Sequence, residues 1–105
     1  MAKEPEAAGS SRFTSTRISV TIDQRPYPVT NMNAFEVLIG GAPDWISVRQ
    51  KIDFTFHLQV GGRDVVLPTY GVVLKNDAGG LDVRYQAPND RWRDLLTKMV
   101  KEEYA

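Results

Sequence analysis

The stretch that contains the central hairpin restricts the fold of this chain more than any other. Apolar and polar side chains alternate without a break along residues 52–60, IDFTFHLQV, which predicts a strand with one buried and one solvated face. Gly61 and Gly62 follow, and both tolerate the positive φ that a tight hairpin needs at its central positions. If Val60 pairs with Arg63, the apolar sides of the two strands coincide. The register of this hairpin is therefore specified.

The second strand of the hairpin carries a proline near its middle. Pro68 cannot donate a hydrogen bond to a neighbouring strand, which favours a bulge or bend at this position. Beyond it, the apolar residues Tyr70, Val72 and Leu74 have the opposite parity from Val65. We therefore predict that the inward face of the strand slips at Pro68 towards these three residues, and that the bent sheet curls.

Shorter segments on both sides of the hairpin show similar apolar patterns. We expect strands over residues 18–22, 27–30, 37–39 and 81–85. The prolines in and beside the second of these segments favour an edge position for that strand. Residues 76–80, NDAGG, are typical of a turn before the last strand.

The C-terminal segment has the pattern of an amphipathic helix. Asn89 or Asp90 can accept hydrogen bonds from the free amides of its first turn. The apolar residues recur at helical spacing and form one stripe that should cover a sheet. This stripe consists of Trp92, Leu95, Leu96, Met99 and Val100. Short antiparallel strands closed by one C-terminal helix indicate a mostly β fold, a small six-stranded antiparallel barrel.

Length, charge and cysteine content limit the function. The 105 residues suffice for one domain, 13 basic residues balance 13 acidic ones, and the chain has one His and no Cys. This composition gives no general case for binding DNA or RNA and disfavours disulfides and metal sites. Residues 1–11 carry no apolar anchor, so we expect them to be disordered and residues 12–105 to form the domain. With no signal peptide and no apolar run near ~20 residues, we expect a cytoplasmic protein that does not insert into membranes.

The order of these parts resembles the PilZ family, small bacterial β-barrel domains that bind cyclic di-GMP. The likeness covers residues 12–100 and is strongest over residues 50–85, which carry the fold. In that family an N-terminal RxxxR motif and a DxSxxG motif at a strand entrance hold the nucleotide. They correspond here to RFTSTR and NMNAFE. The resemblance implies a candidate cyclic di-GMP site formed by Arg12, Arg17, Asn31, Asn33 and Glu36.

Both ligand motifs differ from the family pattern. Four residues instead of three separate the arginines, and Asn, Asn and Glu replace Asp, Ser and Gly. The amide of Asn31 offers one acceptor where aspartate offers two, and a buried donor left facing a donor costs about 1–3 kcal/mol. Glu36 adds bulk and a negative charge beside a ligand that already carries two. We therefore expect weakened nucleotide binding.

Two functions follow from the resemblance. In the first, which we favour, the chain is a non-catalytic PilZ-type module with a degenerate nucleotide site that acts as an adaptor for an unknown protein partner. In the second, it is a genuine receptor that closes Arg12 and Arg17 over cyclic di-GMP at Asn31 and Asn33. These asparagines also suit an ordinary turn, and the arginines also suit a solvated chain end. No cofactor is expected besides this candidate ligand.

Other residues have open roles. Trp45 and Ile46 form either an exposed patch for a protein partner or a plug in one end of the barrel, and we favour the plug because tryptophan buries most of its area when it can. His57 lies on the solvated face of its strand without a partner, so we expect a surface histidine. Asp53 and Glu36 are acids without a defined pairing, and no catalytic motif accompanies them, so we expect no enzymatic activity. The oligomeric state stays open.

Overall fold

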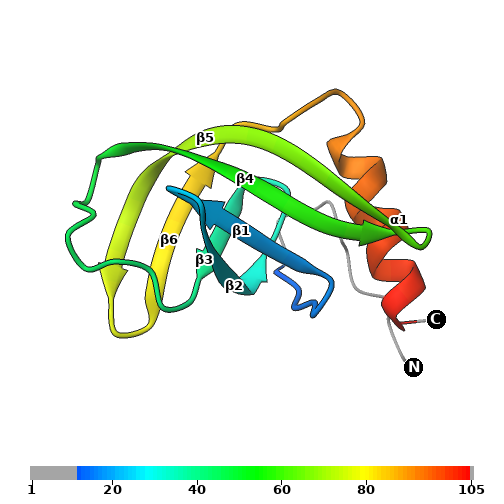
Figure 1. Ribbon diagram of the computed structural model, residues 1–105, viewed down its shortest axis with the longest axis horizontal. Coiled ribbons are helices and arrows are strands. Elements are labelled where there is room, and N and C mark those ends of the chain that lie inside the picture. The colour runs from blue at the N-terminus through cyan, green and yellow to red at the C-terminus, as the bar shows by residue number, and fades with distance from the viewer. Residues whose placement is uncertain (1–11, 105) are drawn as a thin grey trace.

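The computed structural model describes residues 12–104, which form a closed six-stranded antiparallel barrel with one C-terminal helix (Figure 1). The strands are β1 (Ile18–Ile22), β2 (Arg25–Met32), β3 (Glu36–Ile39), β4 (Lys51–Val60), β5 (Arg63–Asp77) and β6 (Gly80–Tyr85), and the helix is α1 (Trp92–Tyr104). Their order around the barrel is β1-β2-β3-β6-β5-β4, and β4 closes on β1. The expected fold class is confirmed. The segment 1–11, expected to be disordered, lies outside the described residues.

The central hairpin has the register that the sequence predicts. Val60 pairs with Arg63, and Gly61 and Gly62 take φ values of 60° and 75° at the turn. Along β4 the residues that face inward are all buried, and those that face outward are exposed or half-buried. Figure 1 shows β4 and β5 as the two longest strands, with their shared turn beside α1. This hairpin forms the longest wall of the barrel.

The second half of β5 corrects one prediction. The strand pairs with β4 continuously through Pro68, and the bulge in its pairing lies further along, against β6. Tyr70, Val72 and Leu74 are 44%, 43% and 42% exposed. The predicted slip of the inward face at Pro68 is therefore wrong, and these three side chains point to solvent.

A glycine allows β5 to keep its inward face unchanged. Gly71 is buried and pairs with Ile52 on β4 and with Tyr85 on β6. A Cβ here would lie 2.6 Å from the Arg84 carbonyl oxygen and 2.6 Å from Val83 Cγ1. These distances are shorter than ordinary contacts, so β5 approaches β6 this closely only because residue 71 has no side chain.

Replacing Gly71 by alanine is expected to destabilise the barrel by about 1–3 kcal/mol, because the added methyl group must displace the backbone of β6. Urea unfolding followed by circular dichroism measures the change. Gly79→Ala is the control, since a Cβ in that exposed turn would meet a side-chain oxygen of Asp77 at 3.2 Å and no backbone. Equal stabilities of the two variants would contradict the close approach of β5 to β6.

β2 is not an edge strand, which corrects a second prediction. It pairs with β1 through residues 25–28 and with β3 through residues 29–32. Pro26 and Pro28 lie in the half of β2 that pairs only with β1. A residue with a neighbouring strand on one side can lack an amide donor at less cost than one paired on both sides. The prolines thus mark a local feature of β2 and not the edge of an open sheet.

The core is centred on aromatic rings from β4, β6 and α1. Between ring centroids, Phe56 lies 5.0 Å from Tyr85 and 4.7 Å from Trp92. Trp92 Nε1 donates to the Tyr85 hydroxyl at 2.7 Å, and that hydroxyl donates to the Asn33 carbonyl oxygen at 2.7 Å. Burial raises the pKa of Tyr85, which keeps the hydroxyl protonated as a donor. A buried chain of hydrogen bonds therefore joins α1 to the turn between β2 and β3.

The helix covers the barrel with the stripe that its spacing predicts. Trp92, Leu96, Met99 and Val100 are buried, and Leu95 is half-buried against the core. Just before α1, Asn89 Oδ1 accepts a hydrogen bond from the backbone amide of Arg91 at 2.9 Å. This asparagine supplies the acceptor expected for the first turn.

Candidate functional site

Arg12 contacts two other candidate ligand residues, Asn31 and Glu36, on the outside of the barrel. Arg12 Nη1 donates to Asn31 Oδ1 at 2.9 Å, and Nη2 lies 2.8 Å from Glu36 Oε1 and 3.2 Å from Asp82 Oδ1. We call these four residues the Arg12 cluster. The three acceptors come from β2, β3 and β6, so closure of the barrel brings them together. One positive charge faces two negative ones.

The backbone beside Arg12 is held against the barrel. Phe13 is 5% exposed, and it exchanges backbone hydrogen bonds of 2.8 Å and 2.9 Å with Met32. Arg12 is therefore not a solvated arginine at a free chain end. The bridge between Phe13 and Met32 sets the guanidinium over the start of β3.

Asn33 builds the turn between β2 and β3. It is 5% exposed, and its Oδ1 accepts the amides of Phe35 and Glu36, both at 2.8 Å. The backbone amide of Asn33 donates to the backbone carbonyl oxygen of Glu36 at 2.9 Å. The turn-forming role considered for the asparagines is therefore observed for Asn33, whereas Asn31 belongs to the Arg12 cluster. The turn places Glu36 where its carboxylate reaches Arg12.

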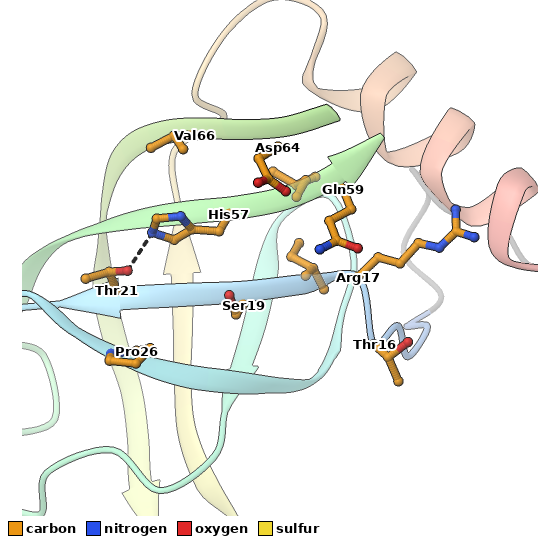
Figure 2. Close-up of a pocket in the computed structure, with 11 residues that line it drawn as sticks. Thr16, Arg17, Ser19, Thr21, Pro26, His57, Gln59, Asp64 and Val66 are labelled. Carbon is orange, nitrogen blue, oxygen red and sulfur yellow. Dashed lines mark hydrogen bonds between the residues drawn. The ribbon is translucent and has the colours of Figure 1, made fainter. Parts of the chain in front are cut away.

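Arg17 binds a different part of the molecule. Its Nη1 lies 3.4 Å from Glu102 Oε1 on α1. The same carboxylate accepts the amide of Gly61 at 2.8 Å, at the turn between β4 and β5. Figure 2 shows Arg17 extending towards α1. The structure therefore brings Arg12, Asn31 and Glu36 together, while the Arg17 side chain binds Glu102 of α1, which also binds the turn of the central hairpin.

A shallow hollow beside Arg17 contains the one histidine of the chain. It measures 360 Å³ and lies on the outer faces of β1, β4 and β5 (Figure 2). His57 is half-buried there, and its Nε2 is hydrogen-bonded to the Thr21 hydroxyl. Within residues 12–104, no carboxylate is hydrogen-bonded to this imidazole. The ring is held by a neutral hydroxyl group.

The last turn of α1 binds the segment that precedes β1. Glu103 Oε1 accepts the amide of Thr16 at 3.0 Å and its hydroxyl at 3.2 Å. The hydroxyl of Tyr104 donates to a backbone carbonyl of the same segment at 2.7 Å. Burial opposes ionisation of Glu103, but the neighbouring Ser15 hydroxyl, the hydrogen bonds from Thr16 and the charge of Arg17 hold its pKa below the ordinary value of 4.5. The ionised carboxylate therefore favours this docked arrangement.

Acid is expected to weaken the docking of this segment. Because the pKa of Glu103 is lower in the folded protein than in the unfolded chain, its contribution to stability is complete above 4.5 and is lost as the pH falls through the folded value. As the pH falls below about 5, the unaltered protein should therefore lose stability more steeply than Glu103→Gln. Urea unfolding across this range measures the difference, with Asp90→Asn, at an exposed position before the helix, as the control. Identical slopes for all three proteins would contradict the expectation.

The loop between β3 and β4 separates the two candidate partner residues. Ile46 is 2% exposed and packs in the core, whereas Trp45 is 61% exposed. The Asn76 side-chain amide donates to the Pro43 carbonyl at 3.0 Å and to the Ile46 carbonyl at 2.9 Å. The interpretation of Trp45 as the plug is wrong, because its side chain is exposed and Ile46 is the buried member of the pair. Ile46 in turn cannot belong to an exposed partner surface.

A second exposed surface runs along β5, and the sequence patterns do not predict that it faces solvent. We call its residues the β5 ridge. They are the apolar residues at five successive outward positions, Val66, Pro68, Tyr70, Val72 and Leu74. All are exposed, four of them by 42% to 54%. Their alternation is visible in the sequence, but alternation alone does not say which face of a strand meets the core.

Neither the comparison with models of known protein families nor the comparison with curated proteins gives a match for this chain. In the part of the chain that the structure describes, no helix is long and apolar enough to cross a membrane. No group of three or more His, Asp or Glu side chains within residues 12–104 is placed to hold a metal ion. The features of the described residues that bear on function are the Arg12 cluster and the β5 ridge.

Proposed function

We propose that the chain is a non-catalytic PilZ-type module of bacterial cyclic di-GMP signalling, which acts as an adaptor that binds a protein. Its nucleotide position is closed by its own side chains. The Arg12 cluster is the observation that carries this proposal. Residues that correspond to both ligand motifs of the family meet in it, but the guanidinium already donates to three protein side chains.

Charge in the Arg12 cluster opposes a nucleotide. Arginine grips phosphate through paired, charge-assisted hydrogen bonds. To do so here, Arg12 has to leave Glu36 and Asp82, which lie 2.8 Å and 3.2 Å away. The two carboxylates then face two phosphate groups without compensation. Each ~1.4 kcal/mol of such opposition lowers the affinity tenfold.

The other candidate ligand residues support the same proposal. Arg17 pairs with Glu102, and Asn33 accepts two backbone amides in its own turn. Each of the five candidate residues thus has a protein partner in the described structure. Loss of such a partner costs about 1–3 kcal/mol of binding free energy unless the ligand supplies an equivalent hydrogen bond.

Calorimetric titration with cyclic di-GMP tests the proposal. We expect no binding heat for the unaltered protein up to about 1 mM ligand. A parallel titration with GMP controls for weak stacking of guanine on the surface. Saturable heat at micromolar cyclic di-GMP would overturn the proposal and support the receptor function, in which Arg12 exchanges its carboxylates for phosphate.

A further inference from the structure

The β5 ridge is a row of apolar side chains on a strand whose two edges are both paired with neighbouring strands at residues 71–72. At Val72, β5 binds both β4 and β6, so a partner must lie on the outer face of the barrel there. The ridge runs eight residue steps from Val66 to Leu74, or about 27 Å at ~3.4 Å per residue. It is narrow, because the outward residues of β4 are polar or charged.

Basic side chains flank the ridge on both sides. Val72 pairs with Lys51 of β4 and with Arg84 of β6, and residues directly opposite each other in an antiparallel sheet point to the same face. Lys51 Nζ lies 4.5 Å from the centre of the Tyr70 ring, so its charge rests against the ridge. Within residues 12–104, neither Lys51 nor Arg84 forms an ion pair. The rim also carries two acids, Asp53 opposite Tyr70 and Asp82 opposite Lys75, and the carboxylate of Asp82 is bound by Arg12.

The basic rim argues against a second copy of the chain as the occupant. Two copies that face each other across the ridge bring Lys51 and Arg84 of both copies into one contact. Like charges in such a partly dehydrated contact repel each other at a cost of several kcal/mol. A partner with carboxylates beside its apolar residues meets the same cations with opposite charge.

We propose that the β5 ridge binds an acidic amphipathic helix of a protein partner. The helix lays its apolar stripe on Tyr70, Val72 and Leu74 and sets carboxylates against Lys51 and Arg84. At 1.5 Å per residue, about 18 residues cover the ~27 Å of the ridge. In the pairing of β6 with β3, Arg84 lies opposite Glu36, whose carboxylate binds Arg12, so the rim borders the Arg12 cluster. This inference rests on the proposed adaptor function and specifies its surface and partner chemistry.

Fluorescence anisotropy with two synthetic helices tests the inference. Both have about 18 residues with leucine at helical spacing, and they differ only in the flanking residues, which are glutamate in one and lysine in the other. We expect the unaltered protein to bind the glutamate helix at least about tenfold more tightly than the lysine helix. Lys51→Glu with Arg84→Glu should reverse this preference.

Substitutions on the ridge separate the apolar contribution from the charge. Tyr70→Ser with Val72→Ser is expected to weaken binding of the glutamate helix about tenfold or more. These side chains are exposed, so circular dichroism should show an unchanged fold. Trp45→Ala removes an exposed aromatic residue outside the ridge and should leave the binding unchanged.

Several results would overturn the inference. They are no binding of the glutamate helix at about 1 mM, equal affinity for both helices, and binding that survives the ridge substitutions. Sedimentation of the protein alone tests the other occupant, and a dimer dispersed by Val72→Ser would also overturn it. Heat with cyclic di-GMP alongside intact helix binding would overturn only the proposed function. If cyclic di-GMP gives no binding heat and the glutamate helix does not bind either, only this inference would be overturned.

Discussion

Replacing Trp92 by alanine is expected to destabilise the protein by about 3–5 kcal/mol, a large part of the stability of a domain of this size. Trp92 is 1% exposed, and its ring lies 4.7 Å from Phe56 between centroids. The substitution leaves a cavity under α1. It also removes the Nε1 donor from the Tyr85 hydroxyl, which opens the hydrogen-bond chain to the turn at Asn33.

The second tryptophan of the chain is a matched control. Trp45 is 61% exposed, so Trp45→Ala should change the free energy of unfolding by less than about 0.5 kcal/mol. Urea unfolding followed by far-ultraviolet circular dichroism compares the two variants without using tryptophan fluorescence. Trp92→Phe keeps most of the apolar volume and should fall between them. A Trp92→Ala protein as stable as Trp45→Ala would contradict the packing of α1 on the barrel.

Combining Asn31→Asp with Glu36→Gly is expected to raise the affinity for cyclic di-GMP about a hundredfold, into the range that calorimetry detects. The first change supplies a carboxylate that accepts two donors of a guanine edge at once. The second removes the negatively charged carboxylate of Glu36, which lies 2.8 Å from Arg12 Nη2. If the two effects are independent, each contributes about tenfold.

Glu102→Gln is the control for this pair of changes. It removes a carboxylate that binds Arg17 and leaves the Arg12 cluster untouched, so its titration should stay silent. Glu36→Gly alone should gain about tenfold, and adding Asp82→Asn to the pair should raise the affinity further. A titration curve unchanged by Asn31→Asp with Glu36→Gly would show that residues 31–36 do not correspond to the ligand motif of the family.

Local patterns were sufficient to predict most of the fold. The unbroken alternation of β4 and the Gly61-Gly62 turn specify a register that the structure reproduces, with Val60 opposite Arg63. The helical spacing from Trp92 likewise predicts the buried stripe of α1. In both elements each residue choice agrees with its neighbours, which is why the sequence pattern is decisive there.

Long-range contacts explain where the sequence patterns mislead. In β5, Gly71 and Val73 fill the inward positions, so the large Tyr70 is left outside together with Val72. Size alone favours the opposite assignment. The reason for the glycine lies in β6, whose backbone passes too close for a Cβ. Similarly, the loop before β4 turns Ile46 inward because Asn76, 30 residues later, binds its carbonyl group.

The candidate site was only partly visible in the sequence. The resemblance names Arg12, Asn31 and Glu36, which do meet in space. It does not name Asp82, which lies 70 residues after Arg12 and is an ordinary outward residue of its strand. Only the neighbouring positions of β3 and β6 in the closed barrel show that a second carboxylate reaches the guanidinium.

Amide NMR spectra of the unaltered protein, recorded with increasing cyclic di-GMP up to about 1 mM, test most directly whether its own carboxylates close the nucleotide position. We expect the signals of Arg12, Asn31, Asn33 and Glu36 to stay in place, because Arg12 keeps its contacts with Glu36 and Asp82. Progressive, saturable shifts at these four residues would contradict this, since they would show that Arg12 leaves the carboxylates for the ligand.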